Sequence, residues 1–233
     1  MDRPAPRPLD TAERLDWLRL IRTPQVGPIT FFQLLQRFGT ARAALKALPA
    51  LARRGGRGTP VSIPSVAEAE RELADVAAAG ARLIGFGEPD YPPALQSIDD
   101  PPPLISLKGN AALGQQRSLG IVGARNASAI AIRFTREIAA ELGRHDLVVA
   151  SGLARGIDTA AHEGAIASGT IAVLGGGIDV AYPAENRKLQ DRIAAEGLLL
   201  AEMPVGTEPQ ARHFPRRNRL ISGISLGVLV IEA

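Results

Sequence analysis

The sequence contains no cysteine, only three histidines and few aromatic residues, which make up 4% of the chain. The lack of cysteine excludes disulfides and thiolate metal sites, and it fits a reducing cytosol. His145, His162 and His213 lie in separate segments, so we predict neither a zinc site nor another metal cofactor. The scarcity of aromatic rings argues against an extended platform for stacking nucleobases.

Long apolar runs are missing as well. The stretch Leu226–Ile231 is interrupted by Gly227 and is far shorter than the roughly 20 residues that a membrane span requires. The start, MDRPAPRPLD, lacks the apolar core of a secretory signal. A length of 233 residues and an apolar content of 45% predict a folded, soluble protein with one sizeable core and a smaller module. Together with the lack of cysteine, this leads us to expect a cytoplasmic protein.

The net charge of +3 conceals an uneven distribution along the chain. Residues 1–60 hold 11 Lys or Arg against 4 Asp or Glu, whereas residues 61–233 hold 16 against 20. A basic N-terminal quarter is typical of a protein with a polyanionic partner, but basic stretches are more often simply solvated. Charge alone leaves both interpretations open.

The first 60 residues predict a small helical domain. Asp10 can cap a helix over residues 10–22, because Glu13 stands three positions further on and the apolar residues share one face. The segment TPQVGPIT interrupts this helix, and ITFFQLLQRFG predicts a second one that ends at Gly39. Residues 51–60, LARRGGRGTP, are rich in glycine and arginine and predict an exposed linker at the domain boundary.

From residue 61 onward, helical and strand patterns alternate. We predict a helix over residues 66–79 and two short strands over 81–86 and 104–109. Five further apolar strands follow, separated by helical segments, at residues 118–124, 146–152, 170–176, 198–204 and 227–233. This alternation is typical of an α/β domain, in which helices cover both faces of a parallel sheet. Because the chain stops at the end of a strand, we expect this domain to be truncated at its C-terminal end.

Glycine and arginine recur where these strands end. Ligands of open parallel sheets bind at the carboxyl ends of the strands, and three of those ends carry GARNAS, SGLARGID and GGGIDV. Glycines let backbone N–H groups approach a ligand closely and helix N-termini attract anions, so these turns suit phosphates. Arg125 and Arg155 add fixed positive charge. A single glycine loop would more often be only a tight turn, and the recurrence in three loops favours an anion site.

The standard nucleotide-binding and catalytic patterns do not occur. GIVGAR, GFGEPD and GGGIDV each fail the G-x-G-x-x-G fingerprint and no G-x-x-x-x-G-K-[ST] is present, so we predict no nucleotide cofactor. Ser151, Asp158 and His162 could form a hydrolase triad, but no G-x-S-x-G turn surrounds Ser151. We assign Asp158 instead to the first turn of a helix, where it satisfies backbone amides beside its helical neighbour His162.

Four motifs resemble, in their order, those of the DNA-processing protein DprA (Smf) family: IVGARNAS, ASGLARGIDTAAHEGAI, VLGGGIDVAYPAENRKLQDRI and FPRRNRLISGIS. The resemblance covers residues 9–233. It implies a sterile-alpha-motif-like domain over residues 1–60 and an extended Rossmann-like domain over 61–233, often followed by a winged helix. The implied function is non-enzymatic: a cytosolic homodimer binds single-stranded DNA, protects incoming DNA and loads the RecA recombinase in natural transformation.

The resemblance also assigns DNA contacts to particular residues. The phosphate-gripping turn falls on Gly123, Ala124 and Arg125, and the Ser-Gly-x-Ala-x-Gly-x-Asp segment begins at Ser151. The basic residue that follows the Tyr-Pro-x-x-Asn motif falls on Arg187 or Lys188, directly after Asn186. The complete predicted DNA-binding set is Gly123, Ala124, Arg125, Ser128, Ser151, Gly152, Arg155, Gly156, Gly175, Gly176, Asn186, Arg187, Lys188, Arg216, Arg217, Asn218 and Arg219.

The last motif, FPRRNR, is predicted to face this site. We number the five apolar strands from 1 (residues 118–124) to 5 (residues 227–233) and expect them to lie in the order 3-2-1-4-5 in the sheet. Strands 1 and 4 are then neighbours where the winding reverses. Arg125 follows strand 1 and FPRRNR follows strand 4, so the two segments should face each other. In the helix that follows, Arg217 is in line with the apolar face and can avoid the core only above the end of the sheet. We therefore expect at least one of Arg216, Arg217 and Arg219 to support the phosphate pocket.

Two alternatives remain open. A nucleotide-processing enzyme, similar to phosphoribohydrolases of the lysine-decarboxylase-like group, would use the same turns with Glu202 or Asp179 as the sugar-directed carboxylate. In the N-terminal domain, VGPITFFQLLQRFG loosely resembles a helix-hairpin-helix, whose amides contact phosphates, although packing or partner docking is the commoner role. Near the strand ends only Tyr182 and Phe214 can stack on bases, so weak sequence specificity is expected.

Overall fold

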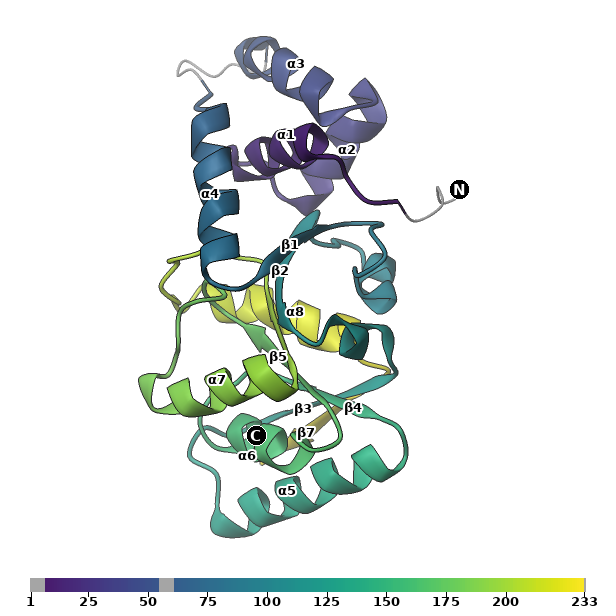
Figure 1. The fold of residues 1–233 in the computed structure, drawn as a ribbon, viewed down its shortest axis with the longest axis vertical. Coiled ribbons are helices and arrows are strands. Elements are labelled where there is room, and N and C mark those ends of the chain that lie inside the picture. Colours follow the sequence, from purple (N-terminus) through teal and green to yellow (C-terminus); the bar gives the residue numbers. More distant parts are fainter. Residues whose placement is uncertain (1–6, 55–60, 233) are drawn as a thin grey trace.

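The computed structural model describes residues 7–54 and 61–232, which form a helical module above a seven-stranded sheet (Figure 1). The module contains α1 (Thr11–Arg22), α2 (Pro28–Phe38) and α3 (Ala41–Arg54). The remaining helices and strands are α4 (Val66–Ala78), β1 (Arg82–Gly85), β2 (Leu104–Gly109), β3 (Ser118–Gly123), α5 (Ala129–Arg144), β4 (Val148–Ser151), α6 (Ile157–Ala165), β5 (Thr170–Leu174), α7 (Arg187–Glu196), β6 (Leu198–Ala201), α8 (His213–Ile224) and β7 (Val228–Ile231).

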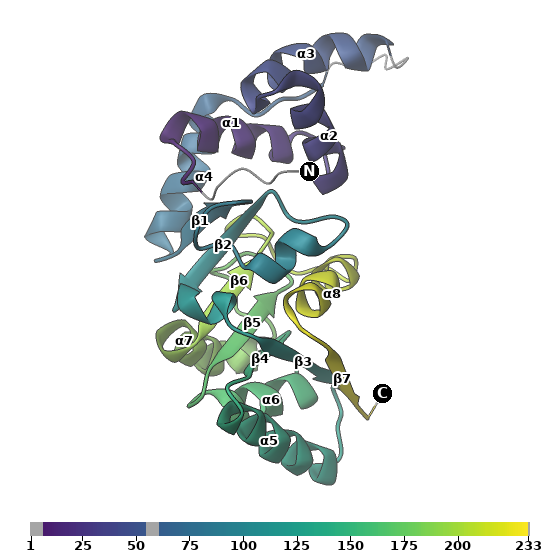
Figure 2. The same cartoon turned by 90° about the vertical axis from the view of Figure 1, so that its right-hand side faces the viewer.

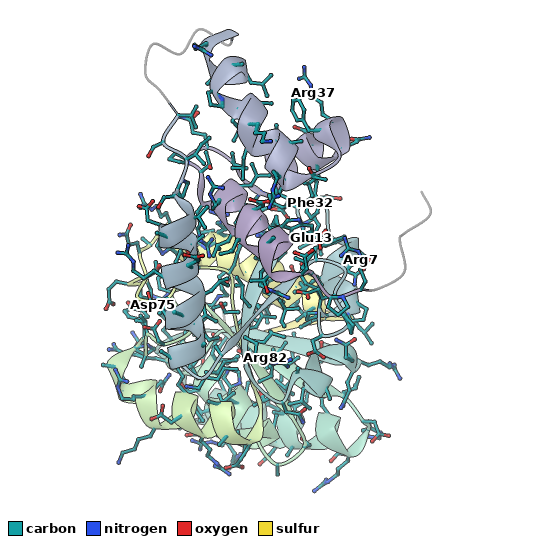
Figure 3. All side chains as sticks on the ribbon, turned by 45° about the horizontal axis from the view of Figure 1, so that its top comes forward. Arg7, Glu13, Phe32, Arg37, Asp75 and Arg82 are labelled. Carbon is teal, nitrogen blue, oxygen red and sulfur yellow. The ribbon has the colours of Figure 1, made fainter. Side chains whose placement is uncertain are left out.

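Local sequence signals explain where the first helices begin and end. Asp10 accepts a hydrogen bond from Glu13 N, and Glu13 accepts one from Asp10 N, which confirms the predicted capping box. Arg7 lies against the same carboxylate at this end of α1 (Figure 3), at 2.6 and 2.8 Å. Gly39 ends α2 with a φ of 79°, a conformation that glycine adopts without strain.

The third helix extends into the predicted linker. Residues 51–54 were assigned to that linker, but they continue α3 through Arg54. Leu, Ala and Arg are strong helix formers, which explains why residues 51–54 are helical. Residues 55–60, the rest of the predicted linker, lie outside the described residues.

The sheet is mixed, and its strand order differs from the predicted one. The order is β1-β2-β6-β5-β4-β3-β7. The five strands β3 to β7 are parallel to their neighbours among them, whereas β1 and β2 add an antiparallel edge next to β6. The predicted order 3-2-1-4-5 is wrong, because β6 pairs with β5 and β7 takes the position beside β3. The winding therefore reverses between β3 and β7.

Helices cover both faces of the sheet, as predicted (Figure 2). On one face, α8 packs against Ile171 and Val173 of β5 and their neighbours. On the other face, α7 covers Ala172 and Leu174, and α5 and α6 cover Val149 together with β3 and β7. Burial on both faces explains why these strands are apolar throughout. Within the described part of the chain, no helix combines the length and hydrophobicity that crossing a membrane requires.

A row of aromatic rings connects the helical module with the sheet. Neighbouring centroids lie 4.9 to 5.5 Å apart, in edge-to-face contacts. Phe32 on α2 contacts Phe86, which directly follows β1. Phe32 also contacts Phe31 of the module, and Phe86 contacts Tyr91 of the sheet domain. More than half of the few aromatic residues are thus used in this contact: Trp17, Phe31, Phe32, Phe86 and Tyr91.

Glu88 adds a polar connection to the same junction. Arg14 of α1 donates to both of its carboxylate oxygens at 2.8 Å, and Leu9 N donates at 2.9 Å. A further bond comes from Gly85 N. Burial alone would raise the pKa of Glu88, but these hydrogen bonds outweigh burial and hold it below its usual value. The ionised carboxylate therefore stabilises the folded state.

Glu88→Gln is expected to lower the free energy of unfolding at neutral pH by about 2 kcal/mol, because it leaves the partly buried Arg14 without its charged acceptor. The pKa of Glu88 is lower in the folded protein than in the unfolded chain. Wild type therefore loses this advantage as the pH falls below about 4. Denaturant unfolding at several pH values should show the gap closing on acidification, whereas Glu137→Gln on exposed α5 should cost little at any pH. A gap that stays constant would contradict the assignment.

Candidate functional site

A hollow of about 430 Å³ opens at the carboxyl ends of β3, β4 and β5, beside the first turn of α8. We call it the strand-exit pocket. Both of the predicted stacking residues, Tyr182 and Phe214, contribute to its wall. Six residues of the predicted DNA-binding set line it: Arg125, Gly152, Arg155, Gly175, Gly176 and Arg217.

The pocket places two guanidinium groups on one aromatic ring. The Cζ atom of Arg125 lies 5.2 Å from the centroid of Phe214, and that of Arg217 lies 5.9 Å from it. Tyr182 stands next to Phe214, with centroids 5.7 Å apart and planes inclined by 35°. Arg125 is exposed, so the ring orients its positive charge at the mouth of the pocket without removing it from solvent.

Arg217 has a different role because its side chain is buried. The residue is 7% exposed, and its Nη1 donates to the carbonyl oxygens of Gly152 and Val173, at the ends of β4 and β5. Burial lowers the pKa of Arg217, while the nearby Asp158 carboxylate opposes this shift. The guanidinium thus connects α8 to the ends of two strands and provides a positive charge at the bottom of the pocket. Its position above the end of the sheet is the one predicted.

Asp158 completes this buried network from the first turn of α6. Its Oδ2 accepts hydrogen bonds from Gly152 N at 3.2 Å and Ala154 N at 3.3 Å, which confirms its predicted place. Burial raises the pKa of Asp158, and the charge of Arg217 counteracts that rise. These two amides are therefore occupied by a protein carboxylate, so any ligand anion must be bound by other donors.

The FPRRNR segment reaches the pocket by a route other than the predicted one. Because β6 lies three strands away from β3, its end does not adjoin Arg125. Instead, α8 crosses the sheet from β6 to β7 and contacts β5, β4 and β3 on its way. Its first turn brings Phe214 and Arg217 above the strand ends. The expected proximity is confirmed, although it arises from a crossing helix and not from adjacent strands.

Several of the glycines are required by close protein contacts. A Cβ atom on Gly123 would lie 1.9 Å from the carbonyl oxygen of Ile231 in β7, and one on Gly176 would lie 2.5 Å from that of Thr207. Gly156 has a φ of 72°, and a Cβ there would lie 2.3 Å from Ala124 O. The glycines thus allow these turns to pack against β7, against the segment before α8 and against the turn after β3.

Three more predicted residues, Asn186, Arg187 and Lys188, lie on the rim at the start of α7, next to Arg155 of the loop after β4. Arg155 is 60% exposed at its side chain and pairs with Glu185. Asn186 is buried, and its Nδ2 donates to Leu153 O at 3.0 Å and to Thr159 Oγ1 at 2.9 Å. It therefore holds the start of α7 against the loop after β4. Arg187 and Lys188 are both exposed on α7, outside the pocket wall.

The remaining arginines of α8 both pair with Glu202, and Arg219 also pairs with the Asp100 carboxylate at 3.2 Å. Arg219 donates to Glu202 at 2.7 Å and to Asp100 O at 2.8 Å, and Arg216 lies 3.4 Å from Glu202. Asn218 is exposed and accepts from Arg217 Nε at 3.2 Å. Within the described residues, Arg217 alone of the three arginines lines the strand-exit pocket.

Ser128 and Ser151 both make local structural bonds. Ser128 Oγ accepts from Ala131 N at 3.2 Å and caps α5. Ser151 is buried, and its hydroxyl donates to Ile121 O at 2.6 Å. His162 Nδ1 lies 2.7 Å from Thr170 Oγ1, and burial lowers the pKa of this histidine to about 3. Serine and histidine therefore do not form a relay, in agreement with the sequence argument against a triad.

The two carboxylates that line the pocket, those of Glu185 and Glu208, were not predicted from the sequence. Glu202 and Asp179 were the predicted candidates, but neither lines the strand-exit pocket: Glu202 pairs with arginines, and Asp179 accepts from Gly206 N at 2.9 Å. The pocket contains Glu185 and Glu208 instead. Glu185 lies inside the AYPAEN motif and could have been considered from its position there. Glu208 has no such signal, because a long loop carries it to the wall.

The fold and the pocket define a Rossmann-like protein with a basic, glycine-lined site at the carboxyl edge of its sheet and an N-terminal helical module. The chain belongs to the family of DNA recombination-mediator protein A, whose family model matches residues 82–233. A model of the DprA-like N-terminal HHH domain matches residues 11–75.

Known relatives agree with this assignment. Protein Smf of Synechocystis is 37% identical over 234 residues, covering 95% of this chain and 59% of the relative. DNA processing protein DprA of Bacillus subtilis is 42% identical over 173 residues, covering 73% and 56%. The chain thus spans little more than half the length of these relatives.

Two solved structures share the fold. DprA from Streptococcus pneumoniae superposes with a TM-score of 0.67 at 38% identity, over 73% of this chain and 59% of that one. DNA processing protein A from Helicobacter pylori, solved in a study of its single-stranded DNA binding mode, gives a TM-score of 0.59 at 29% identity. That match covers 64% of this chain and 68% of the other.

Proposed function

We propose that the protein binds the backbone of single-stranded DNA through the strand-exit pocket. The observation that carries this proposal is the pairing of exposed Arg125 with buried Arg217 around Phe214, in a hollow of about 430 Å³. Arginine forks suit phosphates, and one aromatic pair permits stacking of a base without reading its edge. Support comes from the Helicobacter pylori relative, whose structure concerns single-stranded DNA binding.

The exposed and buried arginines would have different roles in DNA binding. Arg125 donates directly to a phosphate, because its guanidinium is accessible and held in place by the ring. Arg217 contributes a fixed positive charge from below and keeps the loop after β4 in shape. Arg155 is paired with Glu185, so an incoming phosphate competes with that carboxylate for it. The exposed Arg187 and Lys188 on the rim would guide the strand on either side, whereas the buried Ser151 and Asn186 keep the loops in shape.

Arg125→Ala is expected to weaken binding of oligo-dT about 10- to 100-fold at physiological salt, because it removes a charge-assisted hydrogen bond of about 1.5 to 3 kcal/mol. The slope of log affinity against log salt should fall in magnitude by about 0.7, the value for one phosphate contact on a single strand. Fluorescence anisotropy at several salt concentrations measures both quantities. Arg133→Ala, on the exposed face of α5, serves as the matched control. Equal affinities and slopes for both variants would refute the site.

We further propose the cellular role that family membership suggests. In the cytosol, the protein protects incoming single strands without catalysis, acts as a homodimer and loads the RecA recombinase during natural transformation. Residues 1–60 would form one domain and residues 61–233 the DNA-binding domain. Purified protein should therefore release no free base from nucleoside monophosphates, and it should accelerate RecA assembly on coated strands. Base release by wild type, or no effect on assembly, would contradict this role.

A further inference from the structure

A second hollow, of about 660 Å³, separates the helical module from the sheet domain. One wall is the connection between α1 and α2, residues 21–27. The opposite wall comes from the segments before β2 and after β6, and from Arg212 and Arg216 at the start of α8. We call this hollow the module cleft. Interfaces between structural units are common places for ligands.

The start of α8 forms a ridge between the two hollows. Phe214 and Arg217 line the strand-exit pocket, whereas Arg212 and Arg216 line the module cleft. Residues four apart on a helix share one side, with Cβ atoms about 5 to 6 Å apart. The sequence of this turn therefore places Arg217 on the side of the strand-exit pocket and Arg212 and Arg216 on the side of the module cleft.

The charges of the module cleft favour an anion. Arg22 is neutralised by Glu72 at 2.8 Å, and the one lining carboxylate, Glu202, already bonds Arg219 at 2.7 Å. Arg212 is exposed and makes no ion pair with any residue in the described ranges 7–54 and 61–232. The facing wall supplies no acid, because residues 17–67 contain neither Asp nor Glu. An accessible guanidinium thus faces a wall that offers it no counter-ion.

We infer that a DNA strand held in the strand-exit pocket continues over the start of α8 into the module cleft, where Arg212 and Arg216 bind its phosphates. The inference rests on the single-strand binding proposed above, and it gives the helical module a defined part as the far wall of the path. Arg216 lies 3.4 Å from Glu202, and this carboxylate competes with a phosphate for it. Arg212 therefore provides the main contact with the DNA.

The decisive experiment compares oligo-dT of about 4 to 16 nucleotides, the range of site sizes known for single-strand binders, on Arg212→Glu and on a control of equal charge change. Arg133→Glu, on α5, is that control. Long oligonucleotides should bind Arg212→Glu at least tenfold more weakly than the control, with a salt slope reduced by about 0.7. The shortest ones, which fill only the strand-exit pocket, should bind both variants equally. Thermal unfolding checks that both variants are folded.

Two results would overturn the inference. One is equal affinity of Arg212→Glu and Arg133→Glu at every length, which would leave the cleft to solvent or to an acidic protein partner. The other is an equal loss at all lengths, which would indicate a general disturbance of the site. Failure of the proposed function itself looks different, because then Arg125→Ala would leave affinity unchanged even for the longest oligonucleotide.

Discussion

Arg217→Met is expected to lower the free energy of unfolding by about 3 kcal/mol or more, the largest effect that we predict for a side chain of the site. Arg217 is 7% exposed and bonds the carbonyl oxygens of Gly152 and Val173. Methionine fills similar space but leaves both carbonyls without their donor. It also leaves Asp158, which is 5% exposed, as an uncompensated buried charge. Denaturant unfolding, with Arg187→Met on exposed α7 as a control, measures the difference.

The pH dependence gives this prediction a sharper test. Burial already raises the pKa of Asp158, and removal of Arg217 takes away the charge that opposes the rise. The variant therefore gains stability relative to wild type as the pH falls and Asp158 takes up a proton. Asp158→Asn in the Arg217→Met background should recover part of the loss for the same reason. A loss that neither acid nor the second substitution reduces would show that the two charges are not coupled.

Gly156→Ala is expected to cost about 3 kcal/mol and to weaken DNA binding together with stability. Gly156 adopts a φ of 72°, and an alanine there is strained by about 1 to 2 kcal/mol from the backbone alone. Its Cβ would also lie 2.3 Å from Ala124 O and 2.7 Å from Arg125 O. The turn that carries Arg125 must then move, so the guanidinium loses its place beside Phe214.

A second glycine separates these two contributions. Gly87 has a φ of 84°, but a Cβ there would meet nothing within 4 Å. Gly87→Ala thus measures the backbone term alone, about 1 kcal/mol, and should leave oligo-dT affinity unchanged. Equal unfolding losses for the two variants, with full DNA affinity in both, would refute the packing of Gly156 against the Arg125 turn.

Predictions from sequence succeeded where neighbouring residues determine the structure. The capping box of Asp10 and Glu13 and the glycine end of α2 depend on groups a few residues apart. The five parallel strands were recognised from their apolar runs, because both faces of each strand are buried. The helix α3 was not predicted, and its last four residues, 51–54, were predicted as linker because their arginines and the glycines that follow are typical of loops.

The strand order could not be obtained in this way. Both the predicted and the observed orders satisfy the same pattern of strands and helices, and they differ only in whether β6 lies beside β3 or β5. In the structure, α8 connects β6 to β7 across three strands, and its apolar residues pack against β5 and its neighbours. This packing requires β6 and β7 to lie on opposite sides of β3, β4 and β5. The proximity of FPRRNR to Arg125 was therefore predicted correctly from an incorrect strand order.

The sequence by itself determined the kinds of elements, their caps, and the gathering of glycine and arginine turns at one edge of a parallel sheet. These features follow from local periodicity and from the common direction of the strands. Only the tertiary structure decided that Arg217 is buried while Arg125 is exposed, that Glu185 engages Arg155, and that Arg212 faces a cleft beside the helical module. Burial and ion pairing join residues far apart in the chain, and they depend on how the whole core packs.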